Sequence, residues 1–308
     1  MKNIKRSLST ILSLTIIMCV LAASCINVSA EAPFNAVLAA FDDATGTLSL
    51  FGIGEMTTDH AKDWEGYKDR IHYVVIGDGI TSIAPDAFNG CTSLAEVVIG
   101  NDVAVIGEEA FSECTKLEAL TLPDSIKTIE SDAFLNCTNL KTLKLGKAVT
   151  DINEDVLLSF TCEEFIVDKG NSAFSSQNGV LFNKDKTTLI KYPAHNKNTS
   201  YTVPDTVKTI GTSAFINCSN LESVDLPNSL TQINKSAFYN CEKLSLVNVN
   251  SSKSDFNKVI MGVENDSLTD ARITYAGSSS ATGIILAIAF IGIVILLAGV
   301  VLLKKKSK

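Results

Sequence analysis

Apolar residues recur in this chain with a period of 23 residues. Each full copy contains the pair Ala-Phe, a cysteine three residues after the phenylalanine, and a leucine three residues after that cysteine. The phenylalanines of the five copies are Phe88, Phe111, Phe134, Phe215 and Phe238, and the cysteines are Cys91, Cys114, Cys137, Cys218 and Cys241. A fixed period between about 20 and 50 residues is typical of a solenoid, because one unit cannot bury its own apolar face.

Each leucine opens a triplet in which apolar residues alternate with other residues. This alternation predicts a short strand whose apolar side chains face the inside of the coil. A glycine or a proline follows most triplets and ends the strand. A second apolar pair comes next, such as Ile126 and Ile129, and the Ala-Phe segment then predicts a tight helical or 3-10 turn. The last residues of the triplets mark the rungs and are Ile76, Ile99, Leu122, Leu145, Val167, Val203, Leu226 and Val249.

The spacing of the rungs changes around the middle of the chain. Val167 follows Leu145 after 22 residues, and Cys162 takes the place of the opening leucine in that unit. The next marker, Val203, follows after 36 residues, which is 13 more than one unit. We assign the extra length to a hairpin insert at about 168–203 and expect it to project from the stack.

The open ends of a solenoid need covers that shield the apolar interior. We predict an N-terminal cap over residues 31–70, which includes Trp64, and a C-terminal cap over residues 251–276, which includes Phe256. The repeats between the caps occupy residues 71–250.

Residues 1–30 have the pattern of a secretory signal peptide, with basic residues, an apolar stretch and a small-residue cleavage site. We expect cleavage before Glu31. The alternative is a lipoprotein processing site, at which Cys25 would carry the lipid.

Residues 283–303 carry no charge and are long enough to cross about 30 Å of hydrocarbon. A linker at 277–282 precedes them, and a basic tail at 304–308 follows. Because basic residues stay on the cytoplasmic side, we predict a single-pass plasma-membrane protein whose N-terminus and repeats are extracellular. A very apolar buried helix is the alternative for 283–303.

The region between Glu31 and Ser280 is acidic, with 19 basic and 34 acidic residues and a net charge of −15. Such a surface repels phosphate backbones, so we expect no nucleic-acid partner. Six cysteines remain after removal of the signal peptide, and five share one repeat position. This favours a column of free, buried thiols, with disulfides as the open alternative.

The unit from Leu117 to Cys137 resembles the BspA-like leucine-rich repeats of bacterial and some protist surface proteins. The resemblance covers about 34–275. It implies an α/β repeat solenoid that is rich in β-structure, with a short parallel strand and a tight turn in each unit, here combined with one C-terminal transmembrane helix. It also implies display on a cell and a role in adhesion or in contact with a host or matrix. It supplies no binding residues.

Catalytic and metal-binding motifs were sought without success. The three histidines, His60, His72 and His195, have no metal-ligand spacing, and the chain contains no Cys-x-x-Cys pair and no Gly-x-Ser-x-Gly motif. We therefore predict a protein that is not an enzyme and that uses no cofactor and no metal ion. An atypical hydrolase is the remaining enzymatic hypothesis.

Two groups of residues are candidates for contact with a partner. Strand parity places Tyr73, Val75, Glu96 and Val98 on the outside of the sheet, where the three apolar ones would form a patch near the N-terminal cap. In the alternative interpretation, the cap covers them. The second group comes from the insert, whose excess of lysines favours an anionic glycan unless the insert is simply solvated. Its candidates are Lys184, Lys186, Lys191 and Tyr192.

These observations together predict a membrane-anchored surface protein whose solenoid binds an extracellular protein or glycan. We expect the extracellular part to be monomeric. The alternative is a structural or spacer element of the cell envelope that has no discrete ligand.

Overall fold

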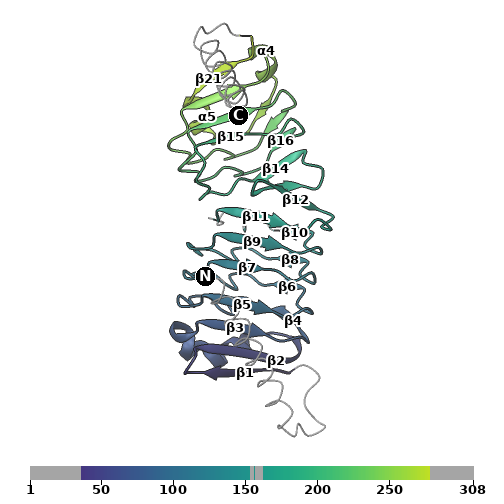
Figure 1. Cartoon of the computed structure of the whole chain (residues 1–308), viewed down its shortest axis with the longest axis vertical. Helices are drawn as coiled ribbons and strands as arrows, with labels where there is room; N and C mark the ends of the chain where they lie inside the picture. The colour runs from purple at the N-terminus through teal and green to yellow at the C-terminus, as the bar shows by residue number, and fades with distance from the viewer. Residues whose placement is uncertain (1–35, 153–155, 157–161, 278–308) are drawn as a thin grey trace, which may run out of the picture.

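The computed structural model describes residues 36–152, 156 and 162–277, which form an elongated stack of coils (Figure 1). The predicted signal peptide at 1–30 and the predicted span at 283–303 lie outside the described residues. Within the described part of the chain, none of the helices has the length and apolar character needed to cross a bilayer.

Each rung contributes short strands to two ladders. In both ladders a residue pairs with the residue 23 positions later, as Val74 does with Val97 and Ile83 with Ile106. The first ladder contains the predicted triplets, as β3 Tyr73–Ile76, β5 Glu96–Ile99, β7 Ala119–Thr121, β9 Thr142–Leu145, β11 Glu164–Val167, β15 Ser200–Thr202, β17 Ser223–Leu226 and β19 Leu246–Val249. The short parallel strands of the sequence prediction are therefore confirmed.

The second ladder is formed by the second apolar pair of each unit, for which no strand was predicted. Most of its strands have only two residues, which is too short for alternation to be recognised. They are β4 Ile80–Ile83, β6 Val105–Ile106, β8 Thr128–Ile129, β10 Asp151–Ile152, β14 Thr188–Lys191, β16 Thr209–Ile210 and β18 Gln232–Ile233.

The Ala-Phe segment closes each coil, and it is not helical as expected. The residue before the alanine and the residue before the cysteine have positive φ, as at Glu109 (50°) and Glu113 (59°). Because left-handed residues alternate with right-handed ones, alternate backbone N–H groups point toward the next rung. Phe88 N thus donates to Ala110 O at 2.8 Å, a bond between rungs that a helical turn would not allow. The described repeats are accordingly β-structure with little helix.

Phenylalanine rings form a column inside the stack. The ring centroids of Phe88 and Phe111 are 5.1 Å apart, and those of Phe111 and Phe134 are 5.7 Å apart. Trp64 of the N-terminal cap extends the column, 5.8 Å from Phe88, and its Nε1 donates to Ala87 O at 2.7 Å. The cap therefore supplies a final aromatic ring and ends the core with its polar atom satisfied.

The repeat cysteines form a second inner column. The Sγ atoms of Cys114 and Cys137 donate to the carbonyl oxygens of Phe88 (3.3 Å) and Phe111 (3.0 Å) in the preceding rung. A small thiol fits the buried position and also supplies a weak donor there. The six cysteines among the described residues are free and buried.

The hairpin insert does not project from the stack, so that expectation was wrong. β12 Phe174–Gln177 and β13 Val180–Asn183 are antiparallel, and β13 pairs with β14, which then continues the second ladder. The side chains of Val180, Leu181 and Phe182 are fully buried. Leu181 belongs to an N-terminal core, whereas Val180 and Phe182 belong to a C-terminal core. A strand that is apolar on both faces must be covered on both, so β13 divides the stack into two cores.

Both ends of the stack are covered. At the N-terminus, β1 Ala36–Asp42 pairs antiparallel with β2 Thr47–Glu55, followed by α2 Thr58–Ala61 and the 3-10 helix η1 Lys62–Arg70. The C-terminal elements are α4 Lys253–Phe256, β20 Ile260–Met261, α5 Asp266–Asp270 and β21 Arg272–Tyr275. Asn265 Oδ1 accepts from Phe238 N at 2.9 Å, where an alanine carbonyl of the next rung accepts in the inner coils.

Candidate binding surface

The predicted outward residues of the first ladder lie where strand parity places them. In β3, Val74 and Ile76 face the core and are 1% exposed, while Tyr73 and Val75 are half-buried on the opposite face. β5 has the same pattern, and the register pairs Tyr73 with Glu96 and Val75 with Val98. The structure therefore brings these four candidate residues together in two short columns.

The cap enlarges this patch. The β1–β2 hairpin continues the same sheet through β2, which pairs in parallel with β3. Leu38 pairs with Phe51 on the outward face, and the side chain of Leu38 is 47% exposed. The alternation within residues 36–42 and 47–53 was the sequence signal that could have identified this extension. We define the N-terminal surface as Leu38, Phe51, Tyr73, Val75, Glu96 and Val98.

A hollow of 410 Å³ lies on the other side of the cap. The rings of Phe41 and Tyr67 stack there with centroids 4.7 Å apart, and the guanidinium carbon of Arg70 is 5.5 and 5.2 Å from them. Arg70 also forms an ion pair with Asp43. The cation is thus already held by two rings and a carboxylate, so we interpret the cluster as part of the cover over the core.

The basic island expected in the insert does not form a contact surface. Lys191 and Tyr192 are 1% and 2% exposed, so these two candidates are wrong. Lys184 Nζ donates to the carbonyl oxygens of Lys169 (3.3 Å) and Asn171, and Lys186 Nζ donates to Gln177 Oε1 at 2.7 Å. The two remaining lysines therefore tie the hairpin together.

The burial of Lys191 and Tyr192 follows from the repeat. They precede Ala214 and Phe215 by 23 residues and take the Ala-Phe place in a disguised rung. The Tyr192 ring stacks on Phe215 with centroids 5.1 Å apart, and Tyr192 N donates to Ala214 O at 2.7 Å. The spacing was available in the sequence, but the dissimilar side chains hid it.

The ammonium group of Lys191 lies in the core near the cysteine column. Nζ donates to Ser213 O at 3.3 Å. Burial lowers the pKa of Lys191 from 10.5 to about 8, because desolvation disfavours the charged form, and nearby Cys218, Cys162 and Cys241 offset part of that effect. A lysine here destabilises the fold at neutral pH.

We expect Lys191→Met to raise the free energy of unfolding by about 3 kcal/mol at pH 7, from the depressed pKa. The folded-state pKa lies below the unfolded one, so the penalty is complete below pH 8 and declines as the pH rises toward 10.5. The advantage of the variant over the parent chain should shrink across that window in urea unfolding. Lys208→Met, at an exposed lysine, is the matched control. An equal gain in both variants would contradict the assignment.

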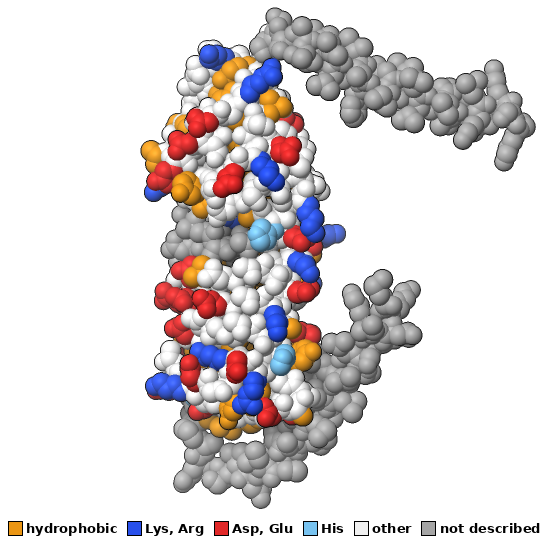
Figure 2. Space-filling model, turned by 90° about the vertical axis from the view of Figure 1, so that its left-hand side faces the viewer, with side chains coloured by type: hydrophobic (Ala, Val, Ile, Leu, Met, Phe, Trp, Pro, Cys, Tyr) orange, Lys and Arg blue, Asp and Glu red, His pale blue; other side chains and the backbone are white. Residues whose placement is uncertain are grey.

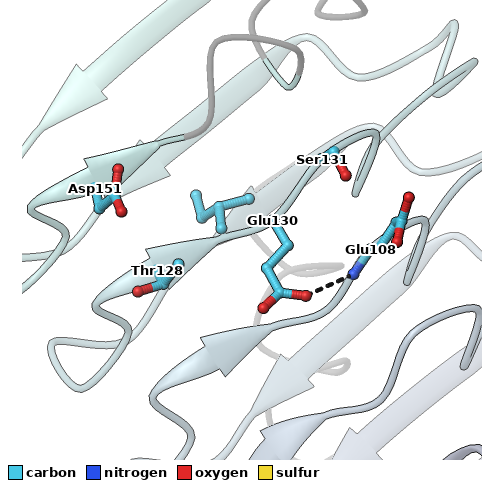
Figure 3. A pocket seen from close by; sticks show the side chains of 6 residues that line it. Glu108, Thr128, Glu130, Ser131 and Asp151 are labelled. Atoms are coloured by element: carbon cyan, nitrogen blue, oxygen red, sulfur yellow. Dashed lines mark hydrogen bonds between the residues drawn. The ribbon is translucent and has the colours of Figure 1, made fainter.

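A polar hollow of 320 Å³ lies beside the second ladder, lined by acidic residues (Figure 3). Glu130 points across to the neighbouring rung, where its carboxylate accepts from Glu108 N at 3.2 Å, while Asp151 lies on β10 at the other side. Among residues 36–152, 156 and 162–277, no group of His, Cys, Asp or Glu is arranged to hold a metal ion. We interpret Glu130 as a link between rungs.

The outward face of the first ladder becomes polar toward the C-terminus. Thr202 Oγ1 donates to Asp225 (2.8 Å), Asn248 Nδ2 donates to the same carboxylate (2.7 Å), and Thr274 Oγ1 donates to Asn248 Oδ1 (2.7 Å). The face drawn in Figure 2 shows acidic and basic side chains dispersed over the stack. The apolar N-terminal surface therefore differs from the hydrogen-bonded C-terminal half.

Comparison with known proteins identifies the repeat. The family model described as "BspA type Leucine rich repeat region" matches six copies, at residues 66–183 and 192–269. The break between the two matched stretches falls at the disguised rung of Lys191 and Tyr192. No curated protein matches the chain.

Several solved structures of bacterial proteins are similar. A leucine-rich repeat protein from Eubacterium ventriosum is 25% identical with a TM-score of 0.59, over 82% of this chain and 72% of that chain. The pneumococcal vaccine antigen PcpA is 21% identical (TM-score 0.44, 67% and 69% covered). A leucine-rich cell surface protein from Faecalibacterium prausnitzii is 17% identical (TM-score 0.33, 82% and 97% covered). The first likeness supports the fold, and the other two carry no argument.

Proposed function

Because the chain belongs to the BspA-type leucine-rich repeat family, we propose that it is a cell-surface repeat protein that binds an extracellular protein through its N-terminal surface. The single observation that carries the proposal is the apolar outward face that continues across β1, β2, β3 and β5. Solenoids commonly bind partners along such an extended surface, and contiguous exposed apolar residues mark interaction sites.

The chemistry of the N-terminal surface indicates the kind of partner. Tyr73 and Val75 supply apolar contact area, and Glu96 and Asp42 are acidic residues at the two ends of the outward row that contains Tyr73. A partner with an apolar centre and a basic edge would complement this arrangement. The extracellular part, in this proposal, is a monomer without catalytic activity, and turnover in a broad hydrolase screen would contradict that part.

Display on the cell is the second part of the proposal. It is supported by the sequence pattern of a signal peptide at 1–30 and by the uncharged stretch 283–303 before the basic tail at 304–308. Together these place the repeats outside the plasma membrane on a single span. Protease added to intact cells should then remove the repeats, and complete protection of the chain would contradict this topology.

The binding proposal predicts the effect of a charge within the N-terminal surface. Val75→Glu and Val98→Glu should each weaken binding by roughly tenfold or more, because a carboxylate would be desolvated in the interface. Thr121→Glu is the matched control, since Thr121 is the exposed residue one 23-residue step after Val98. Protein and glycan arrays probed with residues 31–276 would first identify a ligand, and titration of the three variants would then be compared.

The outcomes separate the hypotheses. Loss of binding in the valine variants, with retention in Thr121→Glu, supports the proposal. Equal affinity in all three variants contradicts the assigned surface. Binding to glycans alone contradicts a protein partner, and silence on both arrays favours a structural or spacer element of the cell envelope.

A further inference from the structure

Exposed apolar side chains also gather at the opposite end of the stack. Tyr239, Ile260, Met261 and Val263 are 52%, 67%, 36% and 66% exposed, and we call them the C-terminal patch. Large aliphatic side chains with two thirds of their surface in water are unusual when they occur close together. Figure 2 shows hydrophobic side chains at this upper end of the molecule.

The C-terminal patch belongs to the last rung. β20 pairs in parallel with β18 and is the terminal strand of its sheet among the described residues. Val263 O accepts from Ser236 N at 2.9 Å, and Tyr239 N donates to Ser236 O at 3.0 Å, which links Val263 and Tyr239 through one residue. The four side chains are therefore held on a rigid rung and not on a loose loop.

The chain leads directly from this rung toward the predicted span. β21 ends at Tyr275, and the predicted linker at 277–282 precedes the uncharged stretch 283–303. Six extended residues reach at most about 20 Å. A span in a bilayer would thus keep the C-terminal patch within a short distance of the lipid surface, so even a weak contact would be populated because it is intramolecular.

We propose that the C-terminal patch rests against the lipid surface and holds the stack away from the membrane by its last rung. This inference depends on the proposed membrane anchoring. Tyr239 suits such a place, because its ring is amphipathic and tyrosine is enriched at membrane interfaces. The N-terminal surface, at the other end of the stack in Figure 1, is then presented outward to an extracellular partner.

The charges around the patch indicate which lipids suffice. Lys258 is paired with Asp255 (2.8 Å) and Lys235 with Glu264 (3.5 Å). Because these lysines already have acidic partners, they add little attraction to anionic headgroups. The contact is therefore apolar in character, and zwitterionic phosphatidylcholine is a sufficient surface for it.

The test uses the full chain reconstituted in phosphatidylcholine vesicles. An environment-sensitive fluorophore is attached at Val263→Cys, and at Leu38→Cys in a matched control at the far end. The native chain treated in parallel supplies the blank for the buried cysteines. With nitroxide-labelled lipids, the probe at 263 should lose most of its emission, whereas the probe at 38 should keep it. Ile260→Ser added to Val263→Cys should weaken the quenching.

Flotation of the vesicles after an alkaline wash separates the two possible failures. A chain that does not float overturns the anchoring and, with it, this inference. A chain that floats but whose probe at 263 behaves like the probe at 38 overturns the inference alone. A probe at 263 that is shielded from aqueous iodide but insensitive to lipid nitroxides indicates a second copy on the patch, which also overturns it.

Discussion

Phe111→Ala is expected to lower the free energy of unfolding by about 4 kcal/mol, through the loss of buried surface and the cavity that remains. Phe111 is fully buried and stacks between Phe88 and Phe134, so its removal also breaks two ring contacts. Urea unfolding followed by circular dichroism measures the effect. Tyr239→Ala is the control, because this aromatic side chain is 52% exposed and its loss should cost little.

The effect of Phe111→Ala should also be local. Phe111 belongs to the N-terminal core, which β13 separates from the C-terminal core. Hydrogen exchange should therefore accelerate mainly in the coils before β11 and much less in β16 to β19, since units of a solenoid contact only their neighbours. Uniform acceleration along the whole stack would contradict the division at β13, and equal losses for Phe111→Ala and Tyr239→Ala would contradict the ring column.

Asn171→Leu is expected to lower the free energy of unfolding by a similar amount, on the order of 4 kcal/mol, because it orphans several buried polar groups at once. Asn171 is fully buried where the chain leaves the first rungs for the hairpin. Its Nδ2 donates to Gly146 O (2.9 Å) and Val149 O (2.8 Å). Its Oδ1 accepts from Ala173 N (2.9 Å) and Phe174 N (2.7 Å).

A graded series makes the Asn171 experiment specific. Asn171→Asp keeps the acceptor for two backbone N–H groups and loses the two donors, but it also buries a carboxyl group, so its loss of stability should remain substantial. Asn198→Leu, at an exposed asparagine, should change the free energy of unfolding little. Chemical denaturation of the three variants gives the comparison. A loss for Asn171→Leu no larger than for Asn198→Leu would contradict the role assigned to Asn171.

The regular part of the fold was predictable from local patterns. The triplets gave the first ladder because alternation reports strand parity directly, and the same parity placed Tyr73, Val75, Glu96 and Val98 on the outer face. Leu38 and Phe51 were missed because their strand belongs to the cap and does not follow the repeat. The contact of these residues with a partner stays a prediction.

Other features depended on interactions between rungs, which a single unit does not reveal. The Ala-Phe segment has the composition of a helical turn, yet Glu109 and Glu113 adopt positive φ. Hydrogen bonds to the next rung compensate for this local cost. The insert was misjudged for a related reason. Its apolar residues were read as a separate hairpin, whereas Val180 and Phe182 face one core and Leu181 the other.

The claim on which the account depends is that the repeat columns lie inside the stack and in register. Alkylation of the cysteines tests it most directly, with the mass of the fragment 31–276 measured before and after unfolding. All six described cysteines are buried, and burial raises the pKa of Cys91 and of Cys137 to about 12, which disfavours the reactive thiolate. We predict no adduct on the folded fragment and an adduct on every one of its six cysteines after unfolding. Rapid modification of several thiols in the folded state would contradict the account, and so would a disulfide that leaves thiols unmodified after unfolding.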